Sequence, residues 1–210
     1  MTIIASIISK TGKSFLISDK QASLGMQAMR LPSGKIVHII NTSILIGHAG
    51  VAAIGPIVIN KLSDQVYKFR RDNKIEFIPH KVLRHLAATV IWDLTNKAGS
   101  FLQAGFILVN YDGETVHSFE LEGSGFVYGE SQTKKYAIGC GCIETKSYLE
   151  SLDESASDEQ IKEKLIDAIL LTNRVNTGCG LGYTIFEMET NGKISWFTTD
   201  EDKNFFKLNN

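Results

Sequence analysis

The order in which strands and helices are predicted constrains this 210-residue chain more than any other feature of its sequence. Short β-branched runs, typical of strands, come in groups, and pairs of longer segments with apolar residues spaced by three and four separate these groups. Strands that alternate singly with helices would predict a doubly wound parallel sheet, whereas blocks predict a layered α+β architecture. We therefore expect an α+β fold in which two sheets lie between two pairs of helices.

The segments behind this prediction run along the whole chain. Strands are predicted at Ile3–Ser9, Ser14–Asp19, Lys35–Asn41, Ser43–Gly47, Gly105–Asn110, Thr115–Leu121, Tyr136–Gly139, Tyr183–Glu189 and Lys193–Thr198. Helices are predicted at Ala52–Arg71, Lys81–Lys97, Thr145–Leu152 and Ser157–Leu171. Ser157 and Gln160 form a capping-box pattern at the start of the last helix. The short runs within the first 47 residues suggest an antiparallel meander.

Composition excludes several classes of protein. Apolar residues make up 43% and charged residues 21%, as in soluble globular proteins and unlike disordered chains. A formal net charge of −1 gives no basic excess that would indicate nucleic-acid binding. Neither a membrane-spanning helix nor a signal peptide is predicted, because no apolar stretch is long enough and the N-terminus carries no basic segment. The sparse cysteines, Cys140, Cys142 and Cys179, suggest reduced thiols in a cytoplasmic protein.

Three features that suggest ligand binding do not meet the requirements of a site. The Gly-Lys-Ser at residues 12–14 is like the end of a phosphate-binding loop, but Ile7 stands where that loop needs a glycine, so a hairpin turn is expected. The Cys-x-Cys at residues 140–142 lacks a second pair of zinc ligands. The histidines show no paired spacing: His38, His48, His80, His85 and His117. We therefore predict neither a cofactor nor a metal site.

Residue 2 is a threonine that directly follows the initiator methionine. Because threonine is small, removal of Met1 is plausible and would expose a free α-amine on Thr2. A threonine hydroxyl is a weak nucleophile, but its own terminal amine can act as the general base. An α-amine titrates at about 7.7–8.0, close to working pH. Thr2 is therefore the candidate nucleophile.

This chemistry needs a cation near the amine, a carboxylate to hold that cation, and donors for an oxyanion. Asp19 ends the second predicted strand and Lys35 begins the third, so both are expected beside the strand that follows Thr2. The Ile-Gly-His-Ala-Gly-Val at residues 46–51 leads from a strand into a helix. Its small residues allow close approach of a backbone N–H, and a helix N-terminus favours negative charge.

With these residues in place, the chain resembles the proteasome β subunits and their bacterial HslV-type relatives, which are N-terminal nucleophile hydrolases. The resemblance extends from Thr2 to about Thr198. It rests on Thr2–Ser6, Ser18–Gly25, Lys35–Ile36, His48–Gly50 and Ala137–Gly141. The Asp-x-Gln-Ala-x-Leu-Gly pattern at residues 19–25 is closer to the bacterial type.

The resemblance implies a four-layer αββα sandwich in which residues 1–210 form a single proteasome-like domain. It implies that Thr2 is the nucleophile, Asp19 and Lys35 are supporting charges, and the Gly50 N–H lies in the oxyanion hole. Cys140 stands where the family has an accessory serine, and its S–H is a poor hydrogen-bonding group. The positions of a supporting aspartate and serine fall on Asn173 and Asn176.

The function implied is that of a threonine endopeptidase in a self-compartmentalised ring of identical subunits. Peptides or unfolded proteins would be its substrates and an ATPase unfoldase its partner, with no nucleic acid and no membrane involved. Two alternatives stay open. A chain that retains Met1 has no basic amine on Thr2, and would be a catalytically silent proteasome-like scaffold or binding protein. The second alternative is that the chain hydrolyses small amides and works outside any chamber.

Overall fold

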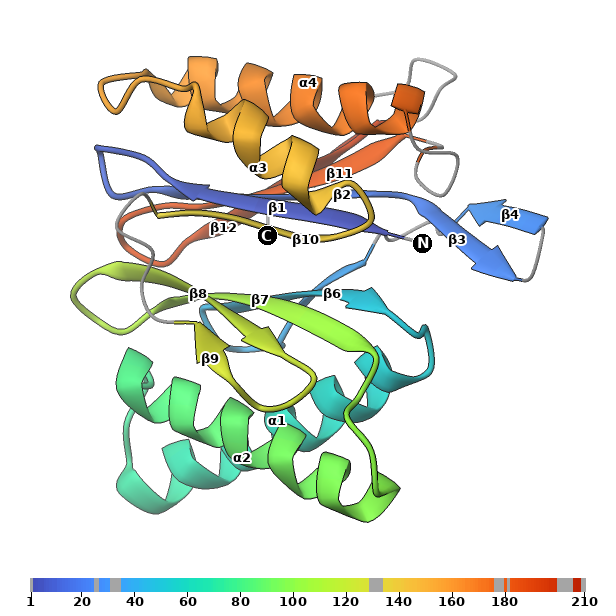
Figure 1. Ribbon diagram of the computed structural model, residues 1–210. Coiled ribbons are helices and arrows are strands. Elements are labelled where there is room, and N and C mark those ends of the chain that lie inside the picture. The colour runs from blue at the N-terminus through green and yellow to red at the C-terminus, as the bar shows by residue number, and fades with distance from the viewer. Residues whose placement is uncertain are drawn as a thin grey trace.

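The computed structural model describes residues 2–24, 27–30, 35–128, 134–175, 180, 182–199 and 206–208. Its elements form four layers (Figure 1). Helices α3 (Cys142–Glu150) and α4 (Asp158–Val175) cover the outer face of one sheet. Helices α1 (Ile54–Asn73) and α2 (His80–Ala98) cover the outer face of the other. The predicted α+β, αββα arrangement is confirmed.

Both large sheets are antiparallel. The first has the strand order β10-β1-β2-β11-β12-β13 and the second the order β5-β6-β7-β8-β9. The strands of the first sheet are β10 (Lys135–Gly139), β1 (Ile3–Ile8), β2 (Ser14–Asp19), β11 (Tyr183–Met188), β12 (Ile194–Thr198) and β13 (Phe206–Leu208). Those of the second sheet are β5 (Ile36–His38), β6 (Ile44–Gly50), β7 (Ala104–Tyr111), β8 (Val116–Glu122) and β9 (Val127–Tyr128).

A separate hairpin of β3 (Gln21–Leu24) and β4 (Gln27–Arg30) projects from the layered body beside the N-terminus (Figure 1). The sequence analysis predicts no strand there, because polar and small residues replace the β-branched run that signals a strand. The antiparallel pairing of β5 with β6 is confirmed, but the predicted meander is wrong in continuing from β2 to β5. Strand β2 pairs with β11 on its second edge, while β5 and β6 belong to the other sheet. Local apolar patterns predict that a strand exists but not which strand it pairs with.

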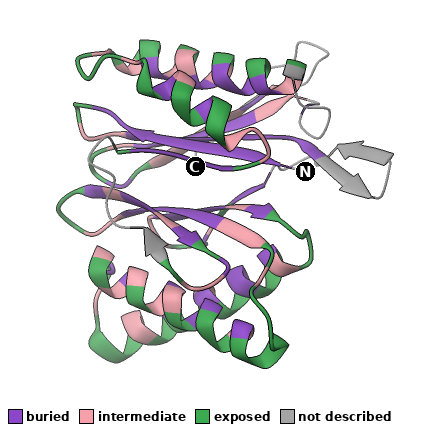
Figure 2. Cartoon of the chain, viewed as in Figure 1, coloured by how far each residue is buried: buried purple, intermediate pink, exposed green. Residues whose placement is uncertain are grey.

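Burial explains why the first strands have continuous apolar runs rather than alternating ones. Every residue of β1 and β2 is buried, because helices cover one face of their sheet and the second sheet covers the other. Ile3 and Ile17 pack with Leu165 under the helices, whereas Ile4 and Leu16 pack between the two sheets. Figure 2 shows the same pattern, with buried residues in the strands and exposed residues on the outer sides of the helices.

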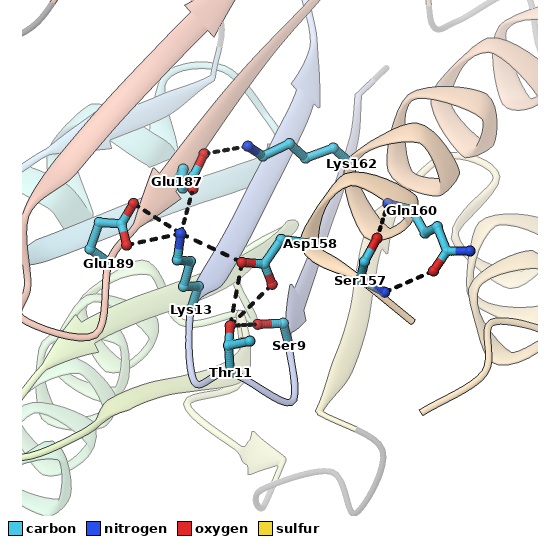
Figure 3. A network of polar contacts seen from close by, with 9 residues as sticks. All are labelled: Ser9, Thr11, Lys13, Ser157, Asp158, Gln160, Lys162, Glu187 and Glu189. Carbon is cyan, nitrogen blue, oxygen red and sulfur yellow. Dashed lines mark hydrogen bonds and ion pairs between the residues drawn. The ribbon is translucent and has the colours of Figure 1, made fainter. Parts of the chain in front are cut away.

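The turn between β1 and β2 confirms the expected hairpin at residues 10–13. The Ser9 N–H donates to the Lys13 carbonyl over 2.8 Å, and Gly12 takes a positive φ of 87°. Lys13 then contacts three carboxylates, at 3.5 Å from Asp158, 3.5 Å from Glu187 and 3.0 Å from Glu189 (Figure 3). This network links the turn to the start of α4 and to the end of β11.

The predicted capping box at the start of α4 is confirmed. The Ser157 N–H donates to Gln160 Oε1 over 2.8 Å, and the Gln160 N–H donates to Ser157 Oγ over 3.3 Å (Figure 3). Two N–H groups that the helix cannot satisfy itself are thereby paired. Among the described helices, none has both the length and the apolar character needed to cross a membrane.

Candidate active site

Thr2 lies directly before the strand at the centre of the candidate site. It is buried, with 7% of its surface exposed. Its carbonyl accepts a hydrogen bond from the Cys140 N–H over 2.7 Å, and the next residue, Ile3, is paired with Gly139 of β10. The backbone of Thr2 is therefore held by the edge of the first sheet rather than by a loose terminal segment.

Strand register brings Asp19 to the same end of the sheet. Because β1 and β2 are antiparallel and Ile4 lies opposite Ser18, the residue after Ser18 lies opposite Ile3. The short turn between the two strands sets this register, so the sequence prediction that Asp19 lies beside the first strand is confirmed.

The Asp19 carboxylate is fully buried and accepts hydrogen bonds at both oxygens. Oδ1 accepts from the Ile3 N–H over 3.0 Å and from Lys35 Nζ over 2.8 Å. Oδ2 accepts from the N–H groups of Gln21 and Gly180, each over 3.2 Å. Asp19 thus connects the peptide group that follows Thr2 to the Lys35 ammonium. Gly180 is not among the predicted site residues, although the glycine-rich run at residues 178–182 is a signal for it.

Lys35 is buried as deeply as its partner, with 3% of its side chain exposed. It directly precedes β5, and its carbonyl accepts a hydrogen bond from the His48 N–H over 3.2 Å. Burial is the largest influence on the pair. It lowers the pKa of Lys35 and raises the pKa of Asp19, against the mutual attraction of the two charges. Lys35 therefore gives up a proton more readily than an exposed lysine does.

His48, which belongs to the segment His48–Gly50 on which the family resemblance rests, is a further residue in contact with Lys35. Its ring stacks on Phe106 with centroids 6.5 Å apart, and its buried Nδ1 has no hydrogen-bond partner within the described part of the chain. Burial and then the Lys35 charge lower its pKa. Gly55 leaves room for the ring, because a Cβ at that position would overlap it. The His48 ring therefore fills the space between β6 and α1, while its backbone N–H contacts Lys35.

Gly50 ends β6 with a positive φ of 119°. A Cβ there would lie 2.7 Å from the Ala104 Cα, so the position requires glycine. The preceding residue, Ala49, reaches the Thr2 region: a Cβ on Gly139 would lie 3.1 Å from the Ala49 Cβ and would overlap the Thr2 carbonyl oxygen. The end of β6 and the backbone of Thr2 thus meet at Gly139.

The structure corrects the prediction for Cys140. This residue is disulfide-bonded, so it has no S–H to offer Thr2, and its backbone N–H makes the contact instead. The expectation of reduced thiols is wrong for Cys140, while Cys142 is a free cysteine. Cys179 lies outside the described residues, as do Met1 and Asn176. The buried Oδ1 of Asn173 has no hydrogen-bond partner among the described residues.

The arrangement suits nucleophilic chemistry. A buried threonine lies beside an ion pair that holds a positive charge in a low-dielectric surrounding, where charge stabilises a developing alkoxide more strongly than in water. Within the described residues, the group of side chains able to hold a metal ion lies elsewhere, around Asp112.

Comparison with known proteins agrees with the geometry. The model of the family described as proteasome subunit matches residues 2–185, a range that begins at Thr2 and includes every predicted catalytic residue. No curated protein matches the chain.

Proposed function

The chain belongs to the proteasome subunit family, and on that premise we propose that it is a threonine endopeptidase whose nucleophile is Thr2 after removal of Met1. The observation that carries the proposal is the buried Lys35–Asp19 pair, with Nζ and Oδ1 2.8 Å apart. The same Asp19 oxygen accepts the N–H of Ile3, the residue after Thr2. The buried Lys35 ammonium, paired with Asp19 beside the candidate nucleophile, supports a catalytic role.

In the proposed reaction, Thr2 Oγ attacks the carbonyl carbon of the scissile peptide bond while its proton passes to the Thr2 α-amine. The positive charge of Lys35 keeps the α-amine unprotonated before the attack, so that it can act as base, and stabilises the forming alkoxide during the attack. Asp19 acts as a positioning residue that holds Lys35. The amine and the hydroxyl belong to one residue, so little positioning entropy is lost.

The attack places negative charge on the former carbonyl oxygen, and the Gly50 N–H is its proposed donor. Collapse of this intermediate breaks the C–N bond. The leaving amine takes the proton from the Thr2 α-amine, and an ester forms on Thr2 Oγ. Water, deprotonated by the same α-amine, then attacks the ester carbonyl carbon. The C–O bond to Thr2 Oγ breaks, the second product leaves as an acid, and the proton returns from the α-amine to Thr2 Oγ. Both half-reactions balance without a metal or cofactor.

Family subunits assemble into rings, and we propose the same for this chain, as a single domain spanning residues 1–210 in a ring of identical subunits. Its substrates would be peptides or unfolded proteins, delivered by an ATPase unfoldase. A cytoplasmic location goes with this proposal. The disulfide at Cys140 would then be transient, as disulfides in reducing compartments usually are.

The test is the intact mass of the purified protein with and without a peptide epoxyketone, which reacts with both the hydroxyl and the free amine of an N-terminal threonine. We expect a mass without Met1 that rises by one inhibitor per chain, together with hydrolysis of peptide substrates. Thr2→Ala should abolish both labelling and hydrolysis. The exposed Thr89→Ala is the matched control and should change neither. Undiminished hydrolysis by Thr2→Ala would overturn the proposal.

One observation favours a second candidate, a proteasome-like scaffold without proteolysis. The Cys140 sulfur is in a disulfide and offers no hydrogen-bonding hydrogen, at the position where the family resemblance implies an accessory serine. If the chain is such a scaffold, the purified protein should retain Met1 and show no mass shift with the epoxyketone. Stoichiometric labelling of Thr2 would exclude the scaffold.

A further inference from the structure

Three metal-ligating side chains meet at the end of the sandwich opposite Thr2. His80 is the first residue of α2, Asp112 follows β7, and His117 lies in β8. Their ligand atoms all lie within 4.8 Å of one another. The sequence analysis missed the group because His80 and His117 are far apart in the chain and have no characteristic spacing.

Both imidazoles face the same carboxylate oxygen. Asp112 Oδ2 lies 2.9 Å from His117 Nε2 and 3.5 Å from His80 Nδ1. The two rings stack with centroids 3.9 Å apart and an interplanar angle of 17°, so one ring must rotate out of the stack before both in-plane nitrogen lone pairs can point at one ion. In a tetrahedral zinc site with bonds of about 2.0–2.1 Å, neighbouring ligand atoms are about 3.3 Å apart. The observed separations lie on either side of this value.

The carboxylate is oriented by its own turn. Asp112 Oδ1 accepts the N–H groups of Glu114 and Thr115 over 3.1 and 3.0 Å, which leaves Oδ2 directed at the histidines. An aspartate carboxylate is ordinarily ionised at neutral pH, as a metal ligand must be.

The group is also accessible. His80, Asp112 and His117 have 18%, 15% and 19% of their side chains exposed. His117 lines a cavity of about 580 Å³ between the two sheets, together with Glu114, Thr115 and Tyr136. The partial exposure of the three side chains leaves a path for an ion to reach them.

We propose that His80, Asp112 and His117 form a binding site for a divalent transition-metal ion, with Zn²⁺ as the best fit. Two imidazole nitrogens and one carboxylate oxygen match the ligand preference of Zn²⁺, whereas Mg²⁺ and Ca²⁺ prefer all-oxygen sites. The hydrogen that joins His117 Nε2 to Asp112 is displaced when the ion binds, so binding releases a proton or moves it to Nδ1. The site is separate from Thr2 and does not depend on the proposed peptidase activity.

The test is calorimetric titration of untagged, chelator-treated and desalted protein with ZnCl₂ at pH 7.5. We expect one Zn²⁺ per chain and an increase in the melting temperature with added Zn²⁺. Co²⁺ in its place should give the intense visible bands of a four-coordinate site. His117→Ala should weaken Zn²⁺ binding at least about a hundredfold, because it removes a ligand and not only an outer partner.

His85→Ala is the matched control, because His85 is an exposed histidine of the same helix α2 that does not belong to the group. It should bind Zn²⁺ as the unaltered chain does. If circular dichroism shows that His117→Ala does not fold, Zn²⁺ binding is measured on His80→Ala instead, since that substitution leaves the Asp112 turn intact. The proposal is overturned if no stoichiometric binding is found, if Mg²⁺ binds equally well, or if the folded ligand variants keep full affinity.

Discussion

At the residue scale, the candidate active site depends on how the Asp19 carboxylate is satisfied. Each of its oxygens accepts two hydrogen bonds, and one of these four donors is the Lys35 ammonium. Such a buried pair adds little net stability compared with an apolar core, but it leaves a costly charge when one partner is removed. The arrangement is therefore better explained by a need for charge beside Thr2 than by a need for stability.

Lys35→Ala is expected to destabilise the fold by about 3–5 kcal/mol, because it leaves the fully buried Asp19 carboxylate without its cation. It should also abolish epoxyketone labelling of Thr2. Urea unfolding followed by circular dichroism measures the first effect. Lys61→Ala, at an exposed position of α1, is the control and should change the unfolding free energy by less than about 0.5 kcal/mol. Similar values for the two variants would contradict the burial argument.

His48 should make the stability of the fold depend on pH. Its pKa in the folded chain is lowered, so between about pH 6.5 and that lower value the unfolded chain binds a proton that the folded chain does not. The free energy of unfolding should therefore fall as pH is reduced below about 6.5. Chemical unfolding in a series of buffers measures this slope.

His48→Gln should flatten the slope, whereas His85→Gln, at an exposed position, should leave it unchanged. An equal slope in His48→Gln and the unaltered chain would assign the effect to other groups.

At the element scale, α1 is built around the His48 ring. Gly55 lies in the first turn of the helix, where a Cβ would overlap that ring. Alanine is a better helix former than glycine by about 1 kcal/mol, so retaining glycine here costs helix stability. The cost is explained by the close approach of α1 to the end of β6.

Gly55→Ala should therefore destabilise the protein by about 1–3 kcal/mol instead of stabilising it, because overpacking outweighs the helix preference. Thermal unfolding measures the change. The matched control is the double variant His48→Ala/Gly55→Ala compared with His48→Ala. With the ring removed, the added methyl group should be neutral or stabilising. A stabilising effect in the presence of His48 would show that the ring moves aside freely.

At the scale of the whole molecule, an apolar surface lies at the edge of the second helix layer. Trp92 and Phe126 are 56% and 70% exposed. The residue before Phe126, Gly125, lies against Trp92, since a Cβ on it would be 3.7 Å from the Trp92 Cβ. Large exposed apolar side chains that lie together are typical of interaction surfaces.

If the chain forms a ring, its mass in sedimentation should be a multiple of 23.2 kDa, and we expect this surface to lie between subunits. Trp92→Glu should then shift the population toward single chains, because it places a charge in an apolar contact. Lys97→Glu adds a negative charge at another exposed position of α2 and serves as control. A single-chain mass for the unaltered protein would contradict the ring.

Most of the elements could be predicted from local pattern alone. β2 was predicted with its exact ends, and the capping box located the start of α4, because strand and helix periodicity and capping depend on neighbouring residues. The approach of Asp19 and Lys35 was also predictable, since both lie at strand ends near the first strand. The hairpin of β3 and β4 was not predicted, because its local pattern of strand-forming residues is weak.

Only the tertiary structure decided which strands share a sheet and that Cys140 is disulfide-bonded. It also brought the His48 backbone to Lys35. At another place it brought His80 and His117 to Asp112. The physical reason is the same in each case. These contacts join residues from separate elements, and they form only when helices and sheets bury their apolar faces together. The sequence by itself determined the elements and the candidate nucleophile Thr2, whereas layer packing decided what surrounds it.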